Sequence, residues 1–421
     1  MIRHLQVSLH ELVKCLSDAV DLVSPVVSNH HRQVGYIAYA LGEQAGFRPE
    51  ECSEMYLAGS LHDIGALSFQ ERLEALDFEV REAHRHARVS YRLMLGFPPL
   101  SDVAEMVKHH HLHWAEREEV KFSSDRNYMG SQVLHLADRI AVLVNRDKDI
   151  LEQVPSIVEK IEKQSGKMFM PELVASFKEL SAKEYFWFDL VSLGHYFSLP
   201  VRMRLPQVNL DLDETLELAD MFRRVIDFRS SFTATHSTGV AVTAQKLAEL
   251  VGFSSRECTL MLIAGYLHDL GKLAVPPEIL EKPGKLNEQE FNVIRSHVFY
   301  SYRLMGNMED LETINTWSSL HHERLDGKGY PFHFRKEELS LGSRIMAVSD
   351  VFTALTEDRP YREGMPGKKA LRILQDMAAQ SALDASLVDL LGTYLDRLNR
   401  TRQEAQQASR EDYQLLEQET G

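Results

Sequence analysis

The sequence predicts an all-α protein made of two tandem helical bundles, and three observations support this prediction. Apolar residues recur at spacings of three to six along most of the chain, as in EQEFNVIRSHVFYSYRLM at 288–305, which is typical of a helix with one buried face. No convincing run of alternating β-branched residues is visible. In addition, the stretch AGSLHDIGAL at 58–67 reappears as AGYLHDLGKL at 264–273, which indicates an internal repeat.

The repeat extends well beyond this stretch. Upstream, an offset of 206 residues aligns His30 with His236, and downstream the offset grows to 211 and then 212, where Asp138 aligns with Asp350. The five residues added first fall in the segment 271–290, whose Pro-Pro and Pro-Gly pairs mark a turn-rich connection. We therefore predict an N-terminal domain at 1–180, a short helical connector at 181–210, a C-terminal domain at 211–400 and a polar tail at 401–421 that forms a frayed or solvent-facing helix.

Composition excludes several classes of function. The formal net charge of −15 repels polyanions, which disfavours binding to a nucleic-acid polymer, whereas a small phosphorylated substrate stays compatible because a bound metal supplies local positive charge. Three cysteines cannot all pair within one chain, so we expect no disulfide framework. No signal peptide and no apolar run of about 18 residues is visible, so we expect a cytoplasmic protein without a membrane span.

The second copy carries an ordered set of seven residues that suits metal binding. Imidazole and carboxylate together favour Mn, Fe, Zn or Co over Ca, and seven groups exceed the needs of one ion. A carboxylate such as Asp269 can bridge two ions about 3.5–4 Å apart, as in two-metal phosphatases. Lys272, one helical turn beyond His268, can reach the phosphate or protonate the leaving oxygen. The set is His236, His268, Asp269, His297, His321, His322 and Asp350.

One histidine on an apolar helix is more often a core residue than a ligand, and the case for metal rests on the occurrence of the ordered set in both copies. The first copy retains the pattern, although the run HHHLH at 109–113 leaves its paired histidines uncertain by one position. Ala66 stands where the second copy has Lys272. The first copy is therefore either a scaffold or dimerisation domain, or a second metal site with different chemistry. Its candidate ligands are His30, His62, Asp63, His86, His110, His111 and Asp138.

Three long motifs of the second copy resemble the HD-GYP branch of the HD phosphohydrolase superfamily. They are HDLGKLAVPPEILEKPGKL at 268–286, HHERLDGKGYP at 321–331 with the Gly-Tyr-Pro tripeptide, and SRIMAVSDVFTALTEDRPYR at 343–362. The resemblance covers about residues 211–400. It implies a helical bundle that hydrolyses a cyclic dinucleotide, cyclic di-GMP or 3′,3′-cyclic GMP-AMP, to the linear 5′-phosphorylated product.

The resemblance also implies roles for individual residues. His236, His268, Asp269 and Asp350 would hold one metal ion, and Asp269 would bridge to a second ion held by His297, His321 and His322. The ions would be iron or manganese. Lys272 would contact the scissile phosphate, and three residues would contact substrate, in keeping with aromatic stacking on a base and guanidinium pairing with phosphate. These three residues are Tyr330, Arg359 and Arg362.

The sequence departs from the family pattern in a few places, and alternatives follow. Phe232 replaces the acidic residue of three-metal members, so two ions are expected, while Ser230 and Thr353 stand where the family commonly has Asp. A non-catalytic module that senses the nucleotide is one alternative. Because simpler members of the superfamily cleave 5′-nucleotides, the first copy could remove the 5′-phosphate of the linear product. A homodimer or a signalling partner is also compatible with the sequence.

Overall fold

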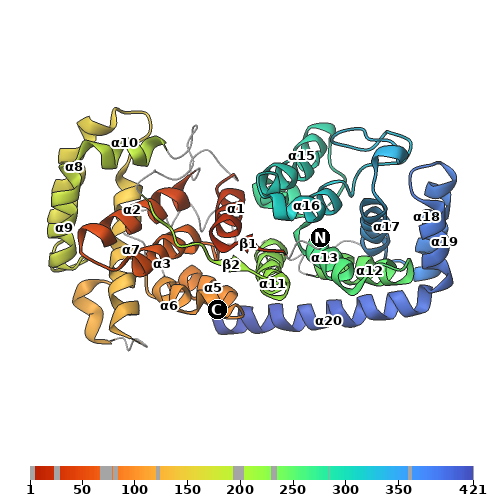
Figure 1. Cartoon of the computed structure of the whole chain (residues 1–421), viewed down its shortest axis with the longest axis horizontal. Coiled ribbons are helices and arrows are strands. Elements are labelled where there is room, and N and C mark those ends of the chain that lie inside the picture. The colour runs from red at the N-terminus through yellow and green to blue at the C-terminus, as the bar shows by residue number, and fades with distance from the viewer. Residues whose placement is uncertain are drawn as a thin grey trace. The chain divides into compact units, whose positions relative to one another are not determined.

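The computed structural model describes residues 5–22, 29–66, 78, 84–119, 124–192, 203–228, 235–282, 284–358 and 363–420. Helices dominate this part of the chain, which confirms the all-α prediction (Figure 1). The chain divides into two compact units, one formed mainly by Ser8–Val208 and the other mainly by Asn209–Glu419. Two short strands, β1 (Val7–Ser8) and β2 (Asn209–Leu210), pair with each other. Among the described helices, none combines the length and the apolar character that a membrane crossing requires.

The N-terminal unit is built around α2, which packs against α3 and α7. Local sequence explains several helix starts: the Ser8 hydroxyl accepts a hydrogen bond from the Glu11 N–H, and α3 begins at a proline. The core includes Ile37 and Leu41 of α2. Its α-helices are α1 (Leu9–Asp21), α2 (His30–Gln44), α3 (Pro49–Leu61), α5 (His84–Met94), α6 (Ser101–Lys108), α7 (Asp125–Leu143), α8 (Ile150–Glu162), α9 (Pro171–Ser181) and α10 (Glu184–Ser192), with 3₁₀ turns at Pro98–Leu100 and Trp114–Glu119.

The C-terminal unit repeats this arrangement with α12 packed against α13 and α17. Capping boxes start α13 at Ser254 and α15 at Asn287. Its α-helices are α11 (Leu212–Phe228), α12 (His236–Leu250), α13 (Ser255–Leu267), α14 (Pro277–Leu280), α15 (Glu288–Met305), α16 (Glu312–Ser319), α17 (Leu341–Thr356), α18 (Gly367–Ala379), α19 (Ala385–Thr393) and α20 (Leu395–Thr420), and its 3₁₀ turns are η3 (Leu270–Ala274), η4 (Glu309–Leu311) and η5 (Lys336–Glu338).

Two segments outside the predicted bundles contain buried side chains, and for the connector its aromatic run FWF at 186–188 already indicated packing. Phe186 and Trp187 of α10, inside the predicted connector, are fully buried. The polar tail is helical and continues α20, but Arg402, Gln406 and Ser409 on one side of it are buried. The prediction of a solvent-facing tail is therefore wrong for that side of the helix.

Candidate metal centres

All seven predicted ligands of the C-terminal unit come together, although they lie on five different helices or directly after them. His236 is the first residue of α12, and Asp350 lies in α17. His297 lies in α15. The remaining four follow helix ends: His268 and Asp269 come directly after α13, and His321 and His322 follow α16.

Asp269 faces two groups of histidines with its two oxygens. Its Oδ2 lies 3.2 Å from His268 Nε2 and 3.8 Å from His236 Nε2, whereas its Oδ1 lies 3.3 Å from His297 Nε2. Asp350 Oδ1 is 3.2 Å from His236 Nε2. One ligand group therefore consists of His236, His268 and Asp350, the other of His297, His321 and His322, and Asp269 lies next to both.

The histidines expose unsatisfied lone pairs to this centre. Nδ1 of His268 bonds the Gly265 carbonyl at 2.7 Å, and His297 and His321 each bond a carbonyl three residues earlier in the same way. This contact fixes the tautomer with hydrogen on Nδ1 and leaves Nε2 as a metal ligand. Nε2 of all three residues is buried and has no hydrogen-bond partner among the residues that the structure describes. Because burying an unpaired polar atom is costly, divalent cations fit this donor set well.

The electrostatics of the centre agree with a cation site. Burial lowers the pKa of His322 to about 3 and that of His321 well below its usual range, so both imidazoles are neutral, as metal ligation requires. Burial alone would raise the pKa of Asp269, but His268 and Lys272 hold it well below the usual range. Lys272 Nζ donates to Asp269 Oδ2 at 2.5 Å. The predicted lysine thus lies at the centre, directly on its central carboxylate.

Sequence reasoning missed Glu357, the buried partner of His236. Its two carboxylate oxygens lie 3.1 and 3.0 Å from His236 Nδ1. Burial alone would lower the pKa of His236, but Glu357 and Asp350 raise it to about 10. Helix α20 adds support, because the Gln406 side chain donates to the carbonyl of Thr235, the residue before His236. The acidic residue after α17 was visible in the sequence, but no local pattern linked it to a histidine 121 residues away.

The tripeptide at 329–331 is placed by a second missed residue, Glu323. Its buried carboxylate accepts hydrogen bonds from the backbone N–H groups of 332, 333 and 334 at 2.7, 3.2 and 3.1 Å. A Cβ atom on Gly329 would overlap the Glu323 backbone, so this approach requires glycine. As a result, the Tyr330 ring lies 4.9 Å from the His322 ring.

Five other predicted positions have different outcomes. Thr353 is buried in α17 and its hydroxyl has no hydrogen-bond partner. Arg359, Arg362, Ser230 and Phe232 lie outside the described residues.

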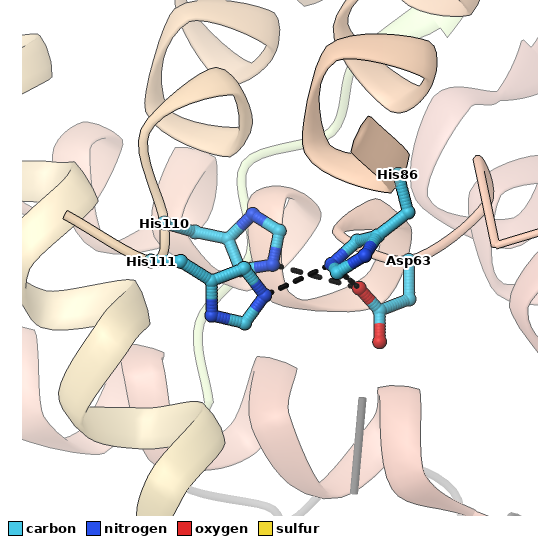
Figure 2. Close-up of side chains that lie close together, drawn as sticks. All are labelled: Asp63, His86, His110 and His111. Atoms are coloured by element: carbon cyan, nitrogen blue, oxygen red, sulfur yellow. Dashed lines mark hydrogen bonds and ion pairs between the residues drawn. The ribbon is translucent and has the colours of Figure 1, made fainter. Parts of the chain in front are cut away.

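The N-terminal unit contains a closely similar cluster. Asp63 follows α3, His86 lies in α5, and His110 and His111 follow α6; these four side chains converge (Figure 2). The alignment had left the paired histidines uncertain by one position, and His110 and His111 are the two in this group. The other candidates lie beside them, in groups formed by His30, His62 and Asp63 and by His62, His110 and Asp138.

Distances in this cluster match those of the C-terminal centre. Asp63 Oδ2 lies 3.3 Å from His62 Nε2, its Oδ1 lies 3.2 Å from His86 Nε2, and His30 Nε2 lies 3.3 Å from Asp138 Oδ1. Within the described ranges of this unit, Nε2 of His30, His62 and His110 is buried without a hydrogen-bond partner. This donor set also fits a divalent cation.

The charged groups around the two centres differ. In place of Lys272 the N-terminal unit has the buried Ala66. Instead, a fully buried Arg139 bonds Asp138 Oδ2 through its Nε at 3.1 Å. A further buried histidine, His31, bonds Asp21 through Nδ1 at 2.5 Å, and its Nε2 has no hydrogen-bond partner. Sequence reasoning missed these residues because the second copy has no matching Arg or His.

Comparison with known proteins decides the family. Models of the HD domain match residues 27–151 and 220–387. The chain is 32% identical over 397 residues, 91% of each chain, to the 3′3′-cGAMP-specific phosphodiesterase 1 of Vibrio cholerae serotype O1. The chain belongs to the HD-GYP family.

Other members of the HD-GYP family are similar over shorter stretches or in fold. The chain is 38% identical over 160 residues to the cyclic di-GMP phosphodiesterase response regulator RpfG of Xanthomonas campestris, covering 38% of this chain and 42% of that protein. The crystal structure of a cyclic GMP-AMP specific phosphodiesterase in V. cholerae (V-cGAP3) superposes with a TM-score of 0.62 at 24% identity, over 93% of this chain and 98% of that chain. The latter supports the fold of this HD-GYP protein.

Proposed function

We propose that the C-terminal centre hydrolyses one phosphodiester bond of a cyclic dinucleotide and releases the linear 5′-phosphorylated product. The observation that carries this proposal is the position of Asp269, whose two oxygens face two separate histidine groups. This arrangement suits a carboxylate that bridges two cations, which we propose to be iron or manganese. The names of the relatives, which are phosphodiesterases for 3′3′-cGAMP or cyclic di-GMP, support the substrate class.

Two divalent cations held by these residues would supply a nucleophilic water and positive charge for the attacked phosphate. The chain's own groups do the rest. Lys272 Nζ, which lies on Asp269, can donate to a phosphate oxygen or give a proton to the leaving oxygen. The Tyr330 ring next to His322 offers a face on which a base can stack. Arg359 and Arg362 would pair with phosphate oxygens, as the family motif implies.

The test compares hydrolysis of cyclic di-GMP and 3′,3′-cyclic GMP-AMP by the full chain with added Mn²⁺. We expect turnover of at least one substrate, and loss of that turnover in Asp269→Ala. An Asp396→Ala variant, altered at an exposed carboxylate of α20, serves as the control. Binding of the nucleotide without turnover would support the alternative, a non-catalytic sensing module.

The N-terminal centre has a second candidate function, the removal of the 5′-phosphate from the linear product. Its seven clustered ligand-type residues and the buried Arg139 favour a phosphate-directed metal site over a scaffold. We expect the full chain to release inorganic phosphate from the linear dinucleotide. Asp63→Ala would abolish this release and leave the opening of the cyclic substrate intact. A chain that opens the cyclic substrate but releases no phosphate would instead support a scaffold or dimerisation role.

Location and assembly belong to the same proposal. A cytoplasmic protein is in keeping with the three cysteines, all of which are buried and unpaired. A homodimer would be detected by measuring the mass of the purified chain in solution, and a signalling partner by an increase in that mass when the partner is added.

A further inference from the structure

The inference concerns Arg295 of α15, two residues before the ligand His297, and it rests on the proposed function. The Arg295 guanidinium lies over the Tyr330 ring, 4.9 Å from its centroid, and 6.0 Å from the centroid of Phe291. The Tyr330 ring in turn lies 4.9 Å from His322. The Tyr330 ring therefore contacts both Arg295 and the predicted metal ligand His322.

Arg295 has no carboxylate within ion-pair distance in the part of the chain that the structure describes. Two other described cations are paired in this way: Lys272 with Asp269, and Arg324, two residues after the ligand His322, with Asp326 at 2.7 Å. Arg295 is half-buried. A guanidinium held in place by aromatic faces and not neutralised by a carboxylate is suited to an anion from outside the chain.

A cyclic dinucleotide brings such an anion. It carries two phosphodiester groups, and only one of them can lie at the metal centre for hydrolysis. The second group keeps its negative charge, and a cation beside the centre can bind it in addition to the phosphate contacts proposed for Arg359 and Arg362. The carboxylates Asp269 and Asp350 of the metal centre are close enough to influence Tyr330 electrostatically and would repel a second phosphate, whereas Arg295 lies over the Tyr330 ring and would attract it.

We propose that Arg295 binds the phosphodiester group that is not cleaved. The planar guanidinium can make two parallel N–H···O bonds to that phosphate while it stays in contact with the Tyr330 and Phe291 rings. Arg295 then selects for substrates with two phosphates, since a simple diester cannot reach the metal centre and the guanidinium together. It contributes to substrate binding and takes no part in bond breaking.

The experiment measures kcat and KM of the full chain with Mn²⁺ on two substrates. One is the cyclic dinucleotide that the chain hydrolyses best, and the other is bis(4-nitrophenyl) phosphate, which has a single phosphodiester. In Arg295→Ala we expect KM for the cyclic dinucleotide to rise by about 10- to 100-fold, the range for a lost charge-assisted hydrogen bond. The loss of kcat/KM with the cyclic dinucleotide should exceed that with bis(4-nitrophenyl) phosphate by the same factor.

Two variants complete the test. Arg295→Lys keeps the charge and should recover part of the affinity for the cyclic dinucleotide but not all of it, because the fork and the stacking face are lost. Arg303→Ala removes an exposed arginine from the same helix and should leave both substrates unaffected. Equal losses on the two substrates in Arg295→Ala, or no change on either, would overturn the inference. Failure of the unaltered chain to hydrolyse any cyclic dinucleotide would overturn the proposed function and this inference with it.

Discussion

The contact between His236 and Glu357 gives a sharp test of how the C-terminal centre is tuned. Glu357→Gln keeps the size of the side chain and removes its charge. The carboxylate lies 3.0–3.1 Å from His236 Nδ1, and a carboxylate in this position makes the opposite nitrogen a stronger metal ligand. Loss of such a partner weakens metal binding by about 10- to 100-fold, or about 1.4–2.7 kcal/mol.

Competition by protons sets the pH dependence of this loss. In the metal-free protein, burial alone would lower the pKa of His236. The nearby Glu357 and Asp350 outweigh burial and raise this pKa to about 10. Metal must displace that proton, so affinity rises with pH up to about 10. Removing the Glu357 charge lowers the pKa of His236 and relieves part of the competition at lower pH. The affinity difference between the variant and the unaltered protein is therefore expected to grow as pH increases.

The assay is an equilibrium titration with Mn²⁺, followed by the signal of the free ion, at about pH 7 and about pH 9. Both proteins carry Asp63→Ala, so that the N-terminal centre does not contribute. Glu363→Gln, at an exposed position close in sequence, is the matched control. Equal Mn²⁺ affinity of the Glu357→Gln variant and the unaltered protein at both pH values would refute the role of Glu357.

Three further predictions concern backbone packing, buried charge and metal. A Cβ on Gly271 would overlap the carbonyl oxygen of His297, so Gly271→Ala should cost about 3 kcal/mol or more in urea unfolding and abolish activity; unchanged stability would contradict this. Burial raises the pKa of Asp227 from 3.8 to about 6, so its contribution is favourable at low pH and is lost as pH rises through about 6. Asp227→Asn should therefore increase the free energy of unfolding at pH 8 by up to about 3 kcal/mol, which a higher melting temperature would show, and should have no such effect at pH 4. Chelation of metal should lower the melting temperature, and added Mn²⁺ should restore it; a melting temperature insensitive to chelator would indicate that the centres bind no metal.

The fold was predictable because its signals are periodic and repeated. Apolar spacing identified the helices, and the matched offsets identified two copies of one bundle. The ligand set was predictable for a related reason: residues such as His268 and Asp269 sit at helix ends, where a short motif fixes their relative positions. Because the same seven candidate ligands occur in the same order in both copies, the sequence indicated one metal-binding cluster in each unit.

The residues that the sequence did not reveal have another feature in common. Each contacts either a residue far away in the sequence or a backbone group. Glu323 reads as one charged residue in a polar loop, yet it binds three backbone N–H groups that position Tyr330. Gln406 belongs to a tail rich in Gln and Glu, yet it is buried and supports the residue before His236. Composition predicts average exposure, whereas these roles depend on which face of a helix meets the rest of the unit.

The two centres show why a repeated ligand pattern does not by itself predict a repeated reaction. Lys272 lies on the central carboxylate of the C-terminal centre with 20% of its side chain exposed, and an amine can give up a proton to a leaving group. Arg139, the cation of the N-terminal centre, is fully buried on Asp138, and a guanidinium keeps its protons at any ordinary pH. Arg139 can supply a permanent positive charge but cannot give a proton to a leaving group. The two centres share their metal ligands but not the amine, so a reaction of the N-terminal centre would take its leaving-group proton from a group other than Arg139. Changing Ala66 to lysine would place an amine at the position of Lys272, next to Asp63, and is the direct way to ask whether that one group separates the two chemistries.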